Sequence, residues 1–174
     1  MPEDTRNVID EFKGMSEADI IKVLDVRGSP VEVAIENTLR DFNMGSVVRS
    51  ANAFGVRTVH VVGRKQWNKR GAMMTDKYLH IRYHDGFDDV RKYADESNRR
   101  IVAVDNVDGA RPLSDAHKTD DVILLFGQEG PGLSEEALAN ADTIVAIEQA
   151  GSTRSLNVGV AAGIVLYEWT HRTI

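Results

Sequence analysis

The chain has 174 residues, of which 42% are apolar and 6% aromatic, and its formal net charge is −6. This is the size of one domain with a substantial aliphatic core, and the composition excludes disordered, collagen-like and low-complexity proteins. The chain has no cysteine, no apolar run near the roughly 18 residues of a membrane span and no signal-peptide pattern at its start, so we expect a cytoplasmic protein without disulfides or membrane contact.

Residues 1–28 are acidic and have helical spacing, which predicts a short helical N-terminal appendage that ends in a turn at residues 28–30. Residues 29–174 show no linker, internal repeat or change of composition, so we expect one domain there. Six short runs within it are rich in Val and Ile, which is typical of strands buried on both faces. These runs are Val31–Ile35, Thr58–Val62, Ile81–His84, Ile101–Asp105, Val122–Phe126 and Ile144–Ile147.

Segments with helical periodicity separate these strands. We expect helices at Met44–Phe54, at Phe87–Ala94 with Asp85 as the N-cap, and at Glu135–Ala141 with Ser134 as the N-cap. The alternation of strands and helices predicts an α/β fold with a six-stranded, mainly parallel sheet and helices on both faces.

The last predicted helix, from Leu156 to His171, is apolar nearly all round and rich in small residues. Water can cover little of such a helix, so it must pack either on its own sheet or against a second subunit. Ser155 stands where the N-cap of this helix belongs. Asn157 lies just inside it, and its amide needs a partner from an adjacent loop or a ligand.

The basic residues are unevenly distributed. Between Asp41 and Asp76 the chain has no acidic residue. This stretch is either a solvated basic face or a patch that binds a polyanion, and charge alone does not decide between the two. Its basic residues are Arg49, Arg57, Arg64, Lys65, Lys69 and Arg70.

A glycine-rich loop, Phe126-Gly127-Gln128-Glu129-Gly130-Pro131-Gly132, connects a predicted strand to a predicted helix. Ligands of parallel α/β proteins bind at such strand ends, and glycines let the backbone approach them closely. The loop is neither a Walker A nor a Rossmann motif, so, taken alone, it is better interpreted as a tight structural turn. His80 and His84 lie on a predicted strand rather than on one face of a helix, and we expect no metal site.

Three segments together resemble the three signature motifs of the SpoU/TrmH family of RNA ribose 2′-O-methyltransferases, in the SPOUT superfamily. The first segment is Asn43-x-Gly45-x-x-x-Arg49-x-Ala51-x-Ala53-Phe54-Gly55. The second is Phe126-Gly127-x-Glu129-Gly130-x-Gly132-Leu133, and the third is Ser155-Leu156-Asn157-Val158 followed by Ala161-Ala162-Gly163-Ile164. Their order and spacing match the family from about Val31 to Arg172.

The resemblance implies an α/β fold whose C-terminal segment forms a deep trefoil knot, and a homodimer assembled through that region. It also implies S-adenosylmethionine as the cofactor, bound in the knot against the loops after the fourth, fifth and sixth strands. The family's backbone contacts to this cofactor fall on Gly127, Ile147 and Leu156.

The family's active-site set falls on Asn43, Arg49, Glu129, Ser155 and Asn157. In the family, the counterpart of Arg49 is proposed to activate the ribose hydroxyl. A guanidinium stays protonated in proteins, so an alternative is that Arg49 stabilises the developing alkoxide and holds a phosphate. RNA contacts are expected from the basic stretch: Arg49, Arg57, Arg64, Lys65, Lys69 and Arg70.

We therefore predict an enzyme that transfers a methyl group from S-adenosylmethionine to a ribose 2′-hydroxyl of structured RNA. The first candidate substrate is tRNA at guanosine 18, followed by large-subunit rRNA and the tRNA wobble position. The alternatives are a catalytically inactive, knotted RNA-binding protein and a nucleotide-binding α/β protein unrelated to RNA. The complete active-site set argues against the former, and the missing phosphate-binding loop argues against the latter.

The chain departs from the family pattern before the third motif. The family usually has Ile-Pro-Met before a glycine, whereas this chain has Ile147-Glu148-Gln149-Ala150-Gly151. A Gln at this position, with Arg154 just before Ser-Leu-Asn, is similar to some tRNA-modifying relatives. Glu148 brings a negative charge close to the cofactor loop.

Overall fold

The computed structural model describes residues 4–37 and 43–171. Its strands are β1 (Glu32–Asn37), β2 (Thr58–Gly63), β3 (His80–His84), β4 (Arg100–Val104), β5 (Arg111–Pro112), β6 (Val122–Phe126) and β7 (Thr143–Ala146). Within the described residues they form one seven-stranded sheet in the order β3-β2-β1-β6-β4-β7-β5. Every neighbouring pair in this sheet is parallel, which confirms the predicted α/β class.

The prediction of six strands is wrong by one. All six aliphatic runs form strands, but β5 is a seventh, two-residue strand that pairs with β7 at the edge of the sheet. Arg111 and Pro112 are both exposed and make no apolar run, so hydrophobic periodicity could not detect them. Pro112 also lacks a backbone N–H, which a strand at a sheet edge tolerates.

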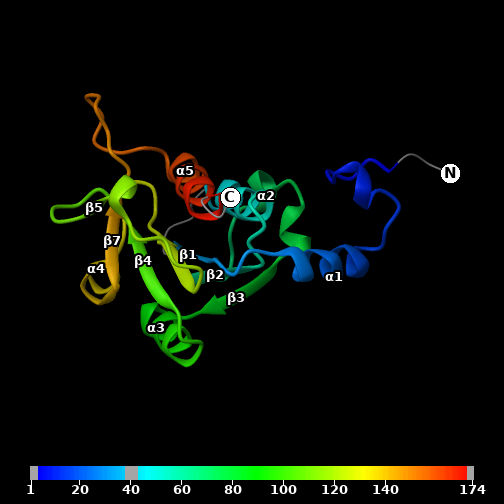
Figure 1. Cartoon of the computed structure of the whole chain (residues 1–174), viewed down its shortest axis with the longest axis horizontal. Helices are drawn as coiled ribbons and strands as arrows, with labels where there is room; N and C mark the ends of the chain where they lie inside the picture. Colours follow the sequence, from blue (N-terminus) through cyan, green and yellow to red (C-terminus); the bar gives the residue numbers. More distant parts are fainter. Residues whose placement is uncertain (1–3, 38–42, 172–174) are drawn as a thin grey trace.

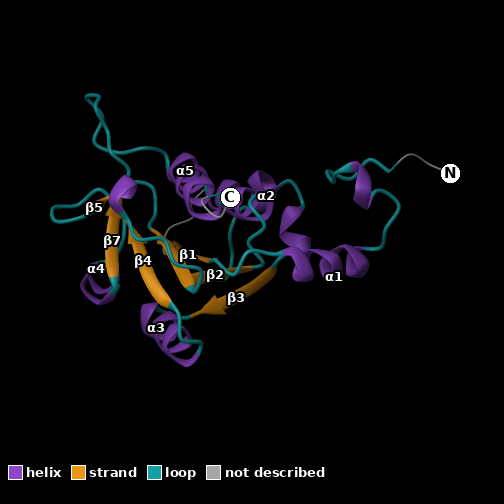
Figure 2. Ribbon diagram, in the orientation of Figure 1, coloured by secondary structure: helices purple, strands orange, loops and turns teal. Residues whose placement is uncertain are grey.

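Helices cover both faces of the sheet, as predicted. The helices are α1 (Glu17–Arg27), α2 (Met44–Ala53), α3 (Phe87–Glu96), α4 (Glu135–Asn140) and α5 (Val158–Thr170). Figure 1 shows α2 and α5 on one side of the sheet and α3 and α4 on the other. Figure 2 shows the same three layers by type of element, with loops joining the layers at both ends of the strands.

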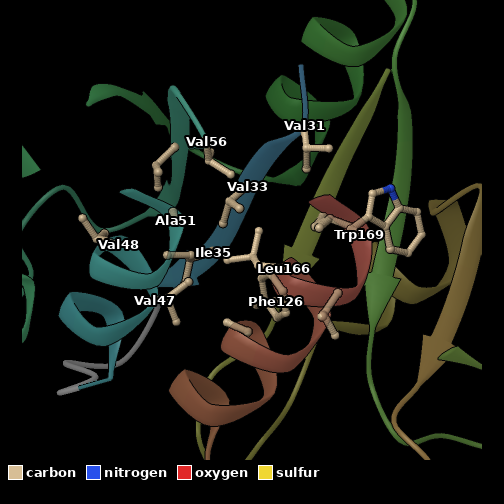
Figure 3. Packing of buried hydrophobic residues seen from close by; sticks show 14 of the residues in the cluster. Val31, Val33, Ile35, Val47, Val48, Ala51, Val56, Phe126, Leu166 and Trp169 are labelled. Carbon is tan, nitrogen blue, oxygen red and sulfur yellow. The ribbon is translucent and has the colours of Figure 1, made fainter. Parts of the chain in front are cut away.

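Two apolar cores lie on the two faces of the sheet. Val33 and Ile35 of β1 pack with α2 and α5 in one core, whereas Ala34 between them belongs to the other core, with α3 and α4. Figure 3 shows side chains of β1, α2 and α5 directed into the same interior. Near the end of α5, the indole N–H of Trp169 donates to the Thr119 carbonyl at 2.9 Å, so this buried polar group is satisfied.

The helix caps were predicted with mixed success. The Ser134 hydroxyl accepts a bond from the Ala137 amide, which confirms it as the N-cap of α4. Asp85 and Ser155 are not caps. Gly86 precedes α3, and the carboxylate at that end is Asp89, the third residue of the helix, which accepts from the Asp85 amide at 3.0 Å.

Asn157 caps α5 in place of Ser155, because the helix starts two residues later than expected. Its side-chain oxygen accepts from the amides of Gly159 and Val160 at 3.0 and 3.3 Å. The amide nitrogen of Asn157 therefore stays available for other contacts.

The helix α1 lies at one end of the molecule, away from the sheet (Figure 1). Phe12 and Ile20 form a small core with Tyr78, separate from the two cores of the sheet. The residues before β1 thus pack on the segment between β2 and β3 and leave the carboxyl ends of the strands uncovered.

Candidate active site

A cavity of about 350 Å³ lies at the carboxyl ends of β4, β6 and β7. Its walls come from residues 104–107 after β4, residues 126–133 after β6, and the segment from Ile147 to the start of α5. Small-molecule sites in proteins have volumes of about 300–1,000 Å³ and lie at such strand ends in parallel sheets. The position and size therefore suit a small organic ligand.

The glycine-rich loop forms one wall of this cavity and folds tightly on itself. The backbones of Gln128 and Gly132 exchange two hydrogen bonds of 3.1 Å. A side chain at Gly127 would place its Cβ 2.3 Å from the carbonyl carbon of Gly132. Only glycine fits at position 127, because the loop's own backbone occupies the space that a side chain would need.

Asp105 and Asn106, which directly follow β4, hold the other walls of the cavity in place. The sequence analysis did not identify either residue as part of the site. The Asp105 carboxylate accepts from the amides of Leu133 and Asn106 at 2.9 and 2.8 Å. The Asn106 side chain donates to the Arg154 carbonyl at 2.9 Å. Polar residues directly after a buried strand were the only signal for this role, since their partners are 28 and 48 residues away.

The structure brings three of the five predicted active-site residues together. Asn157 donates from its amide to the Asn43 side-chain oxygen at 2.8 Å and to Glu129 at 3.4 Å. Asn43 also donates to the Glu129 carboxylate. These residues come from the starts of α2 and α5 and from the glycine-rich loop, so the bonds join three distant segments at one edge of the cavity.

The other two predicted residues lie close by without joining this cluster. Ser155 is exposed and lines the cavity. Arg49 is exposed on α2, does not line the cavity, and has no hydrogen bond or ion pair with a described residue. Its guanidinium is therefore available for an anionic ligand. Asp41 and Phe42, just before the first motif, lie outside the described residues.

The residues predicted to bind the cofactor all line the cavity: Gly127, Ile147 and Leu156. Glu148, between Ile147 and Gln149, is not part of the lining; its carboxylate accepts from the Ser114 hydroxyl. This bond and backbone donors hold the pKa of Glu148 below its usual value. The side-chain oxygen of Gln149 is buried without a hydrogen-bond partner among the described residues.

These features fit S-adenosylmethionine. Gly127 lines the cavity together with Ile147 and Leu156, and the apolar side chains of these last two residues suit a flat ring. The unpartnered oxygen of Gln149 is an acceptor that a donor on such a ligand would satisfy.

The basic stretch is only partly a surface patch. Arg64, Lys65, Lys69 and Arg70 are exposed, with Lys69 2.8 Å from Asp76. The prediction that Arg57 contacts RNA is corrected by the structure. Arg57 is only 9% exposed, and it donates to Asp25 at 2.8 Å and to the Tyr78 carbonyl at 2.7 Å. It links α1 to the sheet and is not available to RNA.

Two of the exposed basic residues, Lys69 and Arg70, lie near the active-site cluster. A Cβ on Gly45, in the first turn of α2, would lie 2.9 Å from the Cα of Gly71, just after Arg70. This close backbone contact fixes the short 3-10 helix Lys69–Ala72 against the turn that follows Asn43. The basic segment and the cluster therefore share one side of the molecule.

Among residues 4–37 and 43–171, no group of three or more His, Asp or Glu side chains is arranged to hold a metal ion. No helix within those ranges is long and apolar enough to cross a membrane.

Sequence comparisons agree with the geometry. Residues 30–167 match the SpoU rRNA Methylase family. The tRNA (guanosine(18)-2′-O)-methyltransferase of Thermus thermophilus is 31% identical over 157 residues, which cover 86% of this chain and 78% of the relative. The protein of the same name from Escherichia coli is 30% identical over 154 residues, which cover 87% and 67%.

Solved structures share the fold. The A. aeolicus TrmH/SpoU tRNA modifying enzyme has a TM-score of 0.79 at 26% identity, over 90% of this chain and 81% of that chain. The SpoU methyltransferase AviRb from Streptomyces viridochromogenes, in complex with the cofactor AdoMet, has a TM-score of 0.75 at 26% identity, over 87% and 63%. The match over most of the chain, with the motif residues gathered at one cavity, shows that this protein belongs to the SpoU rRNA Methylase family.

Proposed function

We propose that this protein transfers a methyl group from S-adenosylmethionine to a ribose 2′-hydroxyl of tRNA, with guanosine 18 as the first candidate. The observation that carries the proposal is the cluster of Asn43, Glu129 and Asn157 at the edge of the cavity. The relatives from Thermus thermophilus and Escherichia coli, named as methyltransferases of that nucleotide, support the substrate. A tRNA substrate would place the enzyme in the cytoplasm.

When bound, the cofactor would supply a methyl group on a positively charged sulfur. The ribose 2′-oxygen would form a bond to that methyl as the S–CH3 bond breaks, which leaves neutral S-adenosylhomocysteine, and the hydroxyl proton would pass to water. Within the protein, Gly127, Ile147 and Leu156 are positioned to hold the cofactor through the loops that line the cavity. Asp105 keeps the glycine-rich loop in the shape that binding requires. Most of the chemical task is thus orientation of two reactants, which a preorganised site can supply.

Arg49 is the residue proposed to act on the ribose. Its guanidinium stays protonated, so it stabilises the 2′-oxygen as negative charge develops and holds an adjacent phosphate. Asn43, Glu129 and Asn157 position the start of α2 and the glycine-rich loop around it. Ser155, exposed at the cavity, completes the pocket wall.

We further propose that the exposed Arg64, Lys65, Lys69 and Arg70, together with Arg49, bind the RNA backbone. The position of Lys69 and Arg70 beside the first turn of α2, and the exposure of the other side chains, support this assignment. Residues 29–174 would then be the methyltransferase domain and residues 1–28 an appendage to it. The family match, which starts at residue 30, supports that boundary.

We also propose that the C-terminal segment forms the family's trefoil knot and that two copies assemble through it. The start of α5 is bonded to Asn43 and Glu129, which supports a C-terminal segment enclosed by earlier parts of the chain. Exposed apolar side chains on α5 support a partner surface: Val160, Ile164 and Tyr167.

The test is transfer of labelled methyl from S-adenosylmethionine to bulk tRNA and bulk rRNA, purified separately from a strain that lacks this gene. We expect incorporation into tRNA, at a position that nuclease digestion then identifies. Arg49→Ala should reduce transfer at least a hundredfold while cofactor binding, measured by calorimetry, stays within about twofold. Arg49→Lys tests whether a single positive charge restores part of the rate.

Incorporation into rRNA alone would overturn the tRNA assignment and keep the reaction. An Arg49→Ala protein with near-normal turnover would overturn the role of Arg49. RNA binding with neither cofactor binding nor transfer would instead support an inactive RNA-binding protein.

A further inference from the structure

Gln149 has an unsatisfied polar group at the cofactor cavity. Its side-chain oxygen is buried and has no hydrogen-bond partner among the described residues, and the residue lines the cavity. Native proteins rarely leave a buried acceptor unpaired, because the group loses its bond to water without replacement. A bound ligand with a suitably placed donor would remove this cost.

The backbone around Gln149 explains why this side chain faces the cavity. Residues 147–149 alternate in direction, as in an extended segment. Ile147 and Gln149 line the cavity, whereas Glu148 between them bonds to Ser114 outside the lining. The bond between Glu148 and Ser114 thus anchors the loop and sets the direction of its neighbour.

Gln149 lies at the end of the cavity remote from the reaction. It follows β7, whereas Glu129 follows β6, and β4 separates these two strands in the sheet. Two strand spacings correspond to about 10 Å. The methyl group must lie near the cluster of Asn43, Glu129 and Asn157, so Gln149 meets a part of the cofactor far from the sulfur.

The chemistry of this end favours a neutral donor over an ammonium group. Glu148 is turned away, and both oxygens of Asp105 accept backbone amides. No carboxylate at the β7 end of the lining is therefore left to pair with a charged amine. An amide oxygen is a good acceptor for the 6-amino group of adenine, and Gln and Asn side chains pair with adenine in this way.

We propose that the Gln149 side-chain oxygen accepts a hydrogen bond from the adenine 6-amino group of the cofactor and selects adenine over a 6-oxo purine. This assignment rests on the proposed function, because it needs an adenosine-containing cofactor in the cavity. The methionine that the family usually has at this position cannot form the bond. Gln149 is thus a binding residue peculiar to this form of the loop.

The experiment measures binding rather than turnover. S-adenosylhomocysteine and S-inosylhomocysteine, which differ only in the 6-amino and 6-oxo groups, are titrated calorimetrically into the wild type, Gln149→Met and Glu148→Gln. The wild type should bind the adenine form at least tenfold more tightly. Gln149→Met should lose about tenfold in affinity for the adenine form and most of the preference, with an unchanged thermal midpoint. Glu148→Gln should keep the preference, because its side chain faces away from the cavity and its amide oxygen can still accept from the Ser114 hydroxyl.

A Gln149→Met protein that keeps the full preference would overturn the proposal. Equal losses for both ligands would also overturn it, because they would assign Gln149 a role in shape alone. A wild type that binds neither ligand would overturn the proposed function itself. The failures of the two proposals are therefore distinguishable.

Discussion

Asp105 stabilises the cofactor cavity through the backbone of another loop. One oxygen of its carboxylate accepts the Leu133 amide and the other accepts the Asn106 amide. In an Asp105→Asn variant, one of these amides would face an NH2 group instead of an acceptor. Hydrogen bonds to charged groups contribute about 1.5–3 kcal/mol, so we expect at least a tenfold loss of affinity for S-adenosylhomocysteine, measured by calorimetry.

Asp108→Asn is the matched control, because Asp108 is exposed in the same loop and is not part of the lining. It should bind the ligand as tightly as the wild type. Equal affinity of the Asp105 and Asp108 variants would show that the loop keeps its shape without the carboxylate.

A buried group of ionisable side chains lies on the opposite face of the sheet, under α3. The Glu32 carboxylate faces the His60 Nε2 at 2.8 Å and accepts from the Tyr93 hydroxyl at 3.2 Å. A carboxylate can only accept, so His60 donates through Nε2, and its Nδ1 forms a hydrogen bond with the Nε2 of His84 at 2.8 Å. Burial and the neighbouring His60 both lower the pKa of His84.

This group predicts a loss of stability in mild acid. Below its ordinary pKa of 6.5, His84 takes up a proton more readily in the unfolded chain, so the free energy of unfolding falls as the pH drops from there through the folded-state pKa. One such group contributes at most about 1.4 kcal/mol per pH unit. Burial would raise the pKa of Glu32, but His60 and Arg99 more than offset it, so this pKa is lowered and Glu32 adds a similar loss only in stronger acid.

Urea unfolding at pH 7.5 and pH 5.5 tests this expectation. The wild type should lose stability over that interval, and His84→Gln should lose less. His117→Gln, at an exposed histidine, should behave like the wild type. The same pH dependence in all three proteins would exclude His84 as its source.

At the scale of residues, the sequence allowed prediction where a motif fixed both identity and spacing, as for Asn43, Glu129 and Asn157. It failed where a role depends on a distant partner. Arg57 was predicted to be available for RNA, because its partner Asp25 is 32 residues away in the sequence and the pairing could not be foreseen. Asp105 was missed for the corresponding reason, since its bond to Leu133 spans 28 residues.

At the scale of elements, the glycine-rich loop depends on close backbone contact. In Gly127→Ala the new Cβ would lie 2.3 Å from the Gly132 carbonyl carbon and 2.5 Å from the Leu133 nitrogen. Both are backbone atoms, so the loop must shift, and such overpacking costs about 1–3 kcal/mol. We expect a lower thermal midpoint and a more than tenfold loss of affinity for S-adenosylhomocysteine.

Gly151→Ala is the corresponding control. Gly151 also lies in a loop next to the cavity, but a Cβ there meets nothing within 4 Å. Differential scanning calorimetry and ligand titration of both variants separate a steric effect from a general effect of glycine replacement. Normal binding by Gly127→Ala would show that the loop can relax away from this contact.

Helices and strands could be predicted from the sequence where their apolar residues form a regular pattern. Strands such as β6, buried along its whole length, are visible as aliphatic runs. The two exposed residues of β5 have no such pattern and gain their strand geometry only from β7. The start of α5 was predicted too early because Ser155 resembles a cap, whereas Asn157 makes the capping bonds.

At the scale of the whole molecule, the layered α/β fold follows from the alternation of strands and helices, but the way copies assemble does not. A nearly all-apolar helix can be covered by its own sheet or by another chain, and the sequence left both open. In the structure, the rest of the chain covers one side of α5 and leaves other apolar positions exposed. Leu166 and Val165 are buried in the core, whereas Val160, Ile164 and Tyr167 are 53%, 38% and 56% exposed.

The exposed positions of α5 are spaced four and three residues apart, so they form one stripe on the helix. A second copy of the chain would cover this stripe and remove its apolar surface from water. We therefore expect the wild type to sediment as a dimer and Ile164→Glu to sediment as a monomer at the same concentration. Val26→Glu is the control, because Val26 is an 88% exposed apolar residue on α1, away from α5. A charge there should leave the dimer intact if the stripe on α5 is the interface. A wild type that is monomeric at micromolar concentration, or an Ile164→Glu protein that stays dimeric, would place the contact elsewhere.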